Sequence, residues 1–317
     1  MAITINTNLS SLIVQSNLSK ATTSLNLAIE RMTTGYKINH ASDNAAGYSI
    51  ARNWEAQLGS LDVAADNAAT GADMLSTLED HYALISTHMQ RVRDLTEQAA
   101  NGTYGTQSLK AIKSEIKARL QEVDRIAANC EFSGQYMMDG SMEDIAIQVG
   151  IDGNSAKSQI TLSDNLFAKG DITSLFKIAE KTVGGKTIPA YNLETLVPAG
   201  EMSPEEASEA RRDRLAQDCA GLTDGTNASS MLTYIDDVIN KISDRVTTLG
   251  AAQNRIESAI TSIGVQSENI MSSLSTLRDA DVAEESSNYI KAQILQQASA
   301  TLLATANQTP SIALNLL

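Results

Sequence analysis

The groups in this chain that could do chemistry are three histidines, two cysteines and one glycine-rich turn that ends in Lys-Thr. His81 and His88 are seven residues apart and would share a helix face. A zinc-binding helix instead places two histidines four apart around a glutamate. His40 is far from both in the sequence. We therefore expect solvated histidines and no metal site.

The turn Val183-Gly184-Gly185-Lys186-Thr187 ends like a phosphate-binding loop. Glu180 stands where the leading glycine of such a loop must be, and its carboxylate would repel phosphates. No Gly-x-Ser-x-Gly nucleophile motif occurs. Cys130 and Cys219 are too far apart for a disulfide framework or a metal knuckle, although a single disulfide between them stays open. The sequence thus predicts no catalytic, cofactor-binding or metal-binding residue, and a protein that is not an enzyme.

The amino-acid composition indicates which secondary-structure elements form most of the chain. Of the 317 residues, 42% are hydrophobic but only 4% are aromatic, and the first 188 contain no proline. This combination favours long helices packed through aliphatic side chains over a sandwich, a barrel or a doubly wound sheet. The formal net charge of −14 argues against nucleic acid as a partner, because phosphate binding depends on clustered basic residues.

Charge is distributed unevenly along the chain. Residues 1–29 carry only Lys20 and residues 286–317 carry only Lys291, which leaves −16 for the residues between them. Both ends mix aliphatic residues with Ser, Thr, Asn and Gln. Two such helices paired together would leave apolar surface in water, which neighbouring chains could cover. This pattern predicts a subunit whose ends become ordered on assembly. A membrane-surface helix is disfavoured because it would carry several basic residues.

Apolar residues recur with the alternating three- and four-residue steps of a coiled coil. The longest run is Leu232, Ile235, Ile239, Ile242, Val246, Leu249, Gln253, Ile256, Ile260 and Ile263, and it continues to Leu277. A second run is Leu75, Leu78, Tyr82, Ile85, Met89 and Val92, followed by Leu109, Ile112 and Ile116. A third is Val14, Leu18, Ala21, Leu25, Ala28 and Met32. These runs predict long helices that pack along apolar seams.

Breaks between the runs predict the connections. Residues 101–105 (Asn-Gly-Thr-Tyr-Gly) indicate a turn between two helices. Alternation over 145–151, the turn 152–154 and the pair Ile160 and Leu162 predict a β-hairpin with a glycine turn. Residues 163–230 lose periodicity and should contain one short helix, with Ser203 as its N-cap, Pro204 at its first position and Glu206 closing a capping box.

Both ends of the chain contain extended motifs. Residues 28–39 (Ala-Ile-Glu-Arg-Met-Thr-Thr-Gly-Tyr-Lys-Ile-Asn) run into Ala45-Ala46-Gly47, which resembles the stretch of bacterial flagellin that joins the inner helix to the rod. Residues 292–298 (Ala-Gln-Ile-Leu-Gln-Gln-Ala), Ala306-Asn307-Gln308 and Leu316-Leu317 are similar to the flagellin C-terminus. With 48–140 and 225–280, the resemblance covers about three-quarters of the chain.

The resemblance implies a mainly α fold, a long antiparallel coiled-coil or helical rod built from both termini, with a β-hairpin and a small α+β insertion. The expected segments are an inner coiled-coil segment and spoke (1–47), the first half of the rod (48–140), a hairpin with a variable outer region (141–225), the C-terminal rod helix (226–280) and the inner C-terminal helix (281–317).

The resemblance also implies a function and its partners. The expected protein is a structural, extracellular subunit that polymerises into the hollow flagellar filament, exported through the type III apparatus without a cleaved signal peptide. Expected partners are further copies of the chain, an export chaperone, and the filament cap and hook-junction proteins. No nucleic acid, membrane or cofactor is expected. Apolar residues of the terminal helices should make the polymer contacts: Leu18, Leu25, Ile29, Met32, Ile294, Leu295, Leu302 and Leu303.

A further implied partner is Toll-like receptor 5. The stretch Gln90-Arg91-Val92-Arg93-Asp94-Leu95 and Glu115 are similar to the surface that this receptor reads in the recognised class of flagellins. Arg91 and Leu95, four residues apart, would share one helix face beside the seam residue Val92. The same residues could instead serve axial packing between subunits.

Other assignments weaken on particular residues. A hook–filament junction protein shares related terminal helices and stays the alternative. A flagellin with a metalloprotease insertion would need a His-Glu-x-x-His helix within 141–225, a region that contains no histidine. A secreted coiled-coil adhesin or effector would leave the paired terminal motifs unexplained.

Overall fold

A computed structural model describes residues 8–179, 181–183, 186–188, 190–198, 203–222 and 228–314 of the chain. The chain forms two compact units, one made of residues 1–60 with 265–317 and the other of residues 61–264. Two long helices, α2 (Ala45–Ala100) and α8 (Ala228–Arg278), contribute to both units. The mainly helical fold with small strands agrees with the prediction. Glu180, Gly184 and Gly185 of the loop-like turn lie outside the described residues.

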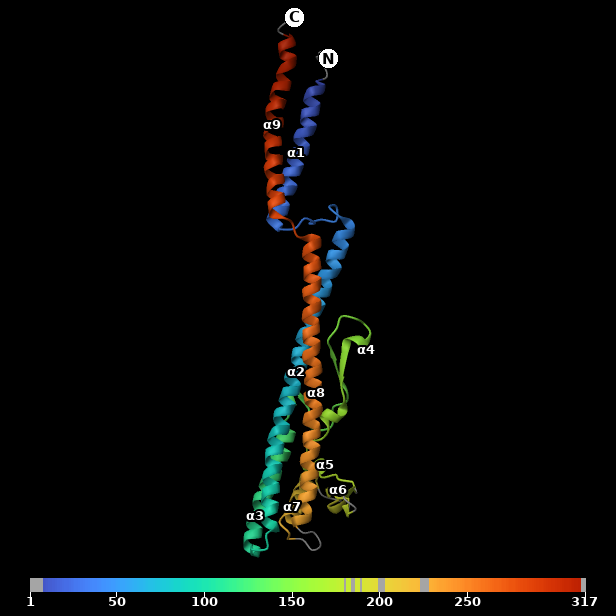
Figure 1. Cartoon of the computed structure of the whole chain (residues 1–317), viewed down its shortest axis with the longest axis vertical. Coiled ribbons are helices and arrows are strands. Elements are labelled where there is room, and N and C mark those ends of the chain that lie inside the picture. Colours follow the sequence, from blue (N-terminus) through green and yellow to red (C-terminus); the bar gives the residue numbers. More distant parts are fainter. Residues whose placement is uncertain are drawn as a thin grey trace. The chain divides into compact units, whose positions relative to one another are not determined.

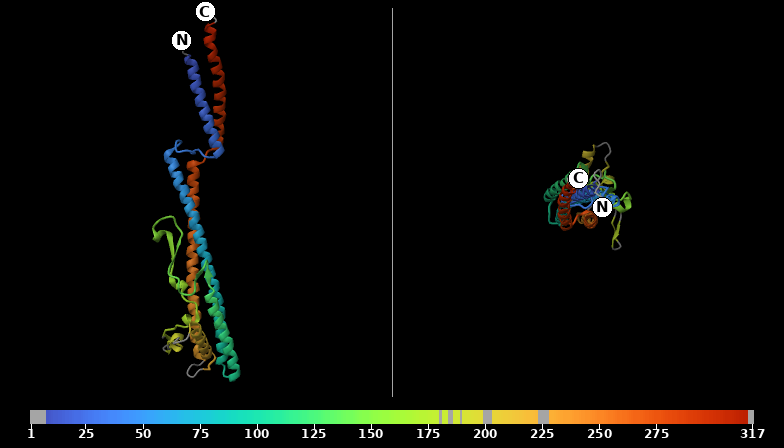
Figure 2. Two further views of the ribbon diagram at one scale, coloured as in Figure 1. Left: turned by 180° about the vertical axis from the view of Figure 1, so that it is seen from behind. Right: turned by 90° about the horizontal axis from the view of Figure 1, so that it is seen from above.

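The first unit is built on the helix pair α1 (Leu9–Thr34) and α9 (Val282–Leu314), which lie side by side (Figures 1 and 2). The side chain of Asn8 caps α1 by accepting a hydrogen bond from the Ser11 amide at 3.1 Å. Gly35 ends the helix in a left-handed conformation, with φ of 76°. Residues 45–60 of α2 and 265–278 of α8 complete this unit.

The second unit packs the remainder of α2 and α8 with α3 (Thr106–Ala128) (Figure 1). The predicted seam of α2 is confirmed, because each of its residues is fully buried: Leu75, Leu78, Tyr82, Ile85, Met89 and Val92. In α8 the predicted seam alternates between buried and half-buried positions from Leu232 to Ile263 and is half-buried from there to Leu277. Gln253, the one polar seam residue, donates a hydrogen bond from Nε2 to Glu79 Oε2 at 2.9 Å. The predicted turn over 101–105 is also confirmed, since it separates α2 from α3.

The predicted hairpin is present, but its turn differs from the expectation. Strands β3 (Ile145–Gln148) and β4 (Gln159–Leu162) pair antiparallel, with Ile147 opposite Ile160. A helical turn, α4 (Ser155–Ser158), lies between them in place of a tight glycine turn, because the Asn154 side chain caps it. Gly71 of α2 lets the hairpin approach closely, since a Cβ there would clash with the Ile147 side chain.

The other strands form two short antiparallel pairs. In the described part of the chain these are β1 (Glu131–Phe132) with β2 (Gln135–Tyr136), and β5 (Lys181–Val183) with β6 (Lys186–Ile188).

The variable region holds more helix than the single one predicted. Besides α7 (Pro204–Cys219) it contains the 3-10 turn η1 (Asp164–Phe167) and the short helices α5 (Ile172–Leu175) and α6 (Leu193–Leu196). One-turn helices are too short to show periodicity, which is why the sequence hides them. The capping box of α7 is confirmed, with Ser203 and Glu206 each bonded to the other's backbone amide.

Cations of α8 hold this region in place. Lys241 Nζ donates to the carbonyls of Leu175 and Lys177 at 3.1 and 2.8 Å, near the end of α5. Arg245 Nη1 donates to the carbonyl of Lys169 at 3.1 Å. Positive groups at carbonyl-rich helix ends are favourable, because they satisfy acceptors that have no partner within the helix.

Cys130 and Cys219 are free and fully buried, so the disulfide that the sequence left open is not formed. Burial raises the pKa of each thiol to about 12. His81 and His88 are half-buried, a correction to the expected solvated histidines, because they flank a seam that several elements cover. In the described part of the chain no cluster of metal-ligating side chains occurs. None of the described helices is long and apolar enough to cross a membrane.

The seam of α2 generates a stability prediction. Replacing Leu78, which is 0% exposed, with alanine should lower the free energy of unfolding by about 2–5 kcal/mol, because it removes packing and leaves a cavity. The control Leu84→Ala lies on the same helix but starts from a side chain that is 52% exposed, and should cost less than about 0.5 kcal/mol. Urea denaturation followed by circular dichroism measures both. Equal effects would contradict the assignment of the seam.

Candidate interaction surface

The terminal helices α1 and α9 run antiparallel and are held in register by polar contacts along their length. Near one end, Asn8 Nδ2 donates to the Ala306 carbonyl at 2.7 Å. Near the middle, Gln296 Nε2 donates to Thr22 Oγ1 at 3.2 Å. Uncharged groups make these contacts, as expected from the composition of both ends.

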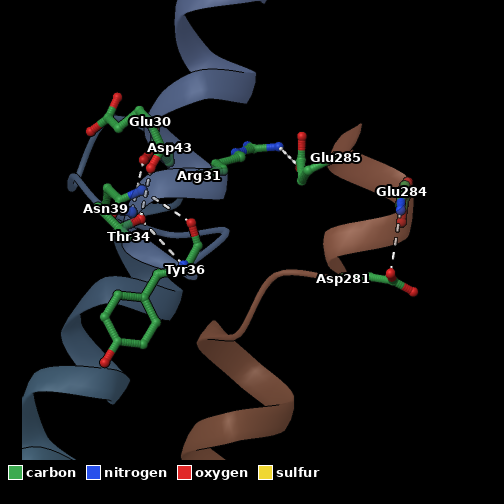
Figure 3. A network of polar contacts seen from close by, with 9 residues as sticks. All are labelled: Glu30, Arg31, Thr34, Tyr36, Asn39, Asp43, Asp281, Glu284 and Glu285. Carbon is green, nitrogen blue, oxygen red and sulfur yellow. Dashed lines mark hydrogen bonds and ion pairs between the residues drawn. The ribbon is translucent and has the colours of Figure 1, made fainter. Parts of the chain in front are cut away.

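An ion pair closes the opposite end of the helix pair. Arg31 Nη1 of α1 donates to Glu285 Oε1 of α9 at 2.9 Å (Figure 3). The Glu285 residue is only 7% exposed, and Arg31 Nε is buried without a hydrogen-bond partner. A charge-assisted bond between two poorly hydrated groups fixes how α1 sits against α9.

Next to this ion pair, the segment that follows α1 forms hydrogen bonds with the segment between α8 and α9. The Lys37 amide donates to the Arg278 carbonyl at 2.7 Å, and the Ala280 amide donates to the Gly35 carbonyl at 2.8 Å. The Arg278 guanidinium lies 4.1 Å from the ring centroid of Tyr36 and forms an ion pair with Glu55. The two connections are therefore joined to each other at one bonded site.

The α1–α2 connection is further fixed by Asp43. Its Oδ2 atom accepts hydrogen bonds from the amides of His40 and Asn39 at 2.9 and 3.1 Å (the Asn39 bond is drawn in Figure 3). These backbone bonds, that of His40 first, hold the pKa of the Asp43 carboxyl below its usual value. His40 also approaches Glu30 Oε1 with its Nε2 atom at 2.7 Å.

The seam predicted for α1 is only partly buried. Ala21 and Ala28 are 6% and 2% exposed, whereas Met32 is 38% exposed. Leu18 and Leu25 are half-buried. Two helices alone bury a narrow strip, and on α1 small residues fill that strip.

The larger apolar side chains of the pair are left partly uncovered beside the strip. Exposed fractions are 44% for Ile29, 60% for Ile294, 49% for Leu295 and 57% for Leu302, whereas Leu303 is half-buried. An apolar surface of this kind typically marks an interaction site. The structure therefore places five of the eight predicted contact residues at the surface of this unit and three at half-buried positions.

The second predicted surface, on α2 and α3, needs one correction. Arg91 Nη2 and Glu115 Oε1 form an ion pair at 2.9 Å, and both side chains are substantially exposed. Gln90 is exposed, and Arg93 Nε bonds to Asp236 Oδ1 at 2.6 Å. Leu95 is 1% exposed, so it is not on the surface that Arg91 shares. The packing of α3 and α8 against α2 widens the buried stripe of α2 and covers it.

The ion pair of the first unit yields a second prediction. Glu285→Ala leaves the Arg31 guanidinium without its partner and should destabilise the packing of α1 against α9 by about 1–3 kcal/mol. Amide hydrogen exchange of α1 and α9 in the monomer measures the loss. Glu284→Ala, one residue away on an exposed carboxylate, is the matched control and should leave exchange unchanged. Equal protection in both variants would rule out this role for the pair.

Comparison with known proteins assigns the chain to a family. Residues 5–143 match the bacterial flagellin N-terminal helical region and residues 232–317 match the bacterial flagellin C-terminal helical region. A flagellin of Xenorhabdus nematophila is 38% identical over 323 residues, and one of Serratia marcescens is 36% identical over 358, each covering 100% of both chains. A putative flagellar hook-associated protein from Vibrio parahaemolyticus shares the fold, with a TM-score of 0.50 and 15% identity over 75% of this chain and 100% of that one. The chain therefore belongs to the bacterial flagellin family, whose members are the filament subunits of the flagellum.

Proposed function

We propose that this chain polymerises through α1 and α9 into the hollow helical filament of the bacterial flagellum, outside the cell. The observation that carries the proposal is the exposed apolar surface of the helix pair. Full burial of one Leu or Ile side chain contributes about 1.5–3 kcal/mol, so covering Ile294, Leu295 and Leu302 together would strongly favour association. Part of this gain is offset by the loss of translational and side-chain freedom on assembly.

The polar sides of α1 and α9 suit the wall of a channel. Between residues 9 and 29 of α1 and between 286 and 314 of α9 they carry Ser, Thr, Asn and Gln but only one charge each, so an unfolded chain would pass without being held strongly by electrostatic attraction. This supports export of the subunit in an unfolded state through the type III apparatus. An export chaperone, the filament cap and the hook-junction proteins are the further partners that this route requires.

Seeded polymerisation tests the proposal. Heat-dissociated protein added to fragments of its own filaments should form long hollow filaments, seen by electron microscopy. A chain that lacks 286–317 should stay folded and soluble but fail to elongate, because most of α9 is gone. Long filaments from the truncated chain would contradict assembly through α9.

The alternative function is that of a hook–filament junction protein. The same experiment separates the two, because a junction protein should stay monomeric on its own seeds and bind only the ends of filaments made by another flagellin.

We also propose that the free subunit is recognised by Toll-like receptor 5 through Gln90, Arg91, Arg93 and Glu115. Gln90 and Arg91 are exposed and Arg93 and Glu115 are half-buried, which supports this assignment, and Leu95 is left out of it because it is buried.

A charge reversal tests this recognition. Arg91→Glu should reduce receptor activation by monomer at least about tenfold, since it removes the ion pair and places like charges at the contact. Arg125→Glu on α3 is the control, because Arg125 is also an exposed arginine paired with a glutamate of its own, Glu122. A reporter-cell assay of receptor signalling reads out both. Equal activity of Arg91→Glu and the unmodified chain would exclude this surface.

A further inference from the structure

Four charged side chains of the first unit have no electrostatic partner among the residues that the structure describes. Lys20 and Lys291 are exposed cations, and Glu268 and Glu284 are exposed anions; none of the four has a side-chain hydrogen bond or ion pair among the described residues. Every other charged side chain of this unit is bonded within the unit. Unpaired charges on a surface that is otherwise almost neutral indicate where a partner of opposite charge would bind.

The two unpaired cations line the same cavity. Lys20 of α1 and Lys291 of α9 both line a cavity of about 680 Å³ between these helices. Its walls are partly apolar, with Leu295 and Leu302 among them. Glu285 is the one carboxylate of the lining, and it is already bonded to Arg31. The cavity therefore offers two ammonium groups and no free acceptor of their charge.

One unpaired carboxylate lies on the same face of α9 as the cavity. Glu284 precedes Asn288, Lys291 and Leu295 by steps of four, three and four residues, which places all of them on one helix face. Seven residues of helix separate Glu284 from Lys291 by roughly 10 Å along the axis. This spacing is too long for a bond within one chain. A face with an acid at one end and bases further along is complementary to a copy of itself displaced along the axis.

We propose that the carboxylate of Glu284 from a second copy of this chain enters the cavity and pairs with Lys20 and Lys291. The inference rests on the proposed polymerisation. It names the charged side chains that would determine how neighbouring copies are placed against each other. Such a contact is heterologous, because each copy uses its bases on one side and its acid on the other, and it can repeat without closing. The exposed apolar side chains around the cavity supply affinity, and the charges fix the stagger between copies.

Charge exchange in seeded growth tests this contact. The double variant Lys20→Glu with Lys291→Glu should elongate on its own seeds at least about tenfold more slowly than the unmodified chain, because three carboxylates would meet. Adding Glu284→Lys to that double variant should restore growth to within about threefold, since the signs are then exchanged on both sides of the contact. The defect of the double variant should shrink as salt is raised, through screening that a packing defect would not show.

Glu268→Lys is the matched control, because it makes the same change of charge at the other unpaired carboxylate of this unit. It should leave the slow growth of the double variant uncorrected. Circular dichroism of each monomer establishes that all variants are equally folded. Normal growth of the double variant, or no recovery on adding Glu284→Lys, would overturn the inference while leaving polymerisation intact. An unmodified chain that fails to grow on its own seeds would refute the proposed function and this contact with it.

Discussion

Two helices that pair with each other can bury only the strip along which they touch. In α1 and α9 this strip is filled by small residues such as Ala21 and Ala28, so the larger aliphatic side chains remain outside it. The ion pair of Arg31 with Glu285 and the bonded helix breaks fix the pair without covering that surface. This unit therefore leaves large aliphatic side chains in water, and the proposed assembly would cover them.

In the second unit, other elements cover the apolar surface that a helix pair alone would leave exposed. There α3 and the short elements after it cover sides of α2 and α8 that a helix pair would leave in water. Lys241 and Arg245 bind carbonyl groups of those short elements, so the irregular segment is held by the helices it covers. The result is a continuous core with a surface of ion pairs, of which Arg91 with Glu115 is one.

Periodicity predicted much of this arrangement because the seams obey one simple rule. Leu75 through Val92 are buried where the three- and four-residue steps place them, and the long run in α8 is buried or half-buried at those steps. The rule assumes that each helix packs against one partner helix. It missed Leu95, which is buried because more than one helix packs against α2 and widens its buried stripe. It also could not place Arg31 against Glu285, because 254 residues separate them and only the antiparallel pairing of α1 with α9 brings them together. The sequence shows that Lys20, Glu284 and Lys291 are isolated charges. That the two lysines line one cavity could be seen only from the packing of α1 against α9.

The two buried thiols have a consequence for the life of the chain in an oxidising medium. The thiolate is the reactive form in disulfide exchange, and burial keeps Cys130 and Cys219 protonated across the physiological range. In the folded protein both thiols are therefore poor nucleophiles for disulfide exchange between neighbouring copies. The vulnerable interval is the time between synthesis and folding, when both sulfur atoms are open to solvent. Rapid folding of the helical core thus protects both thiols from oxidation. In the folded protein, their rate of oxidation depends on how often the core unfolds locally.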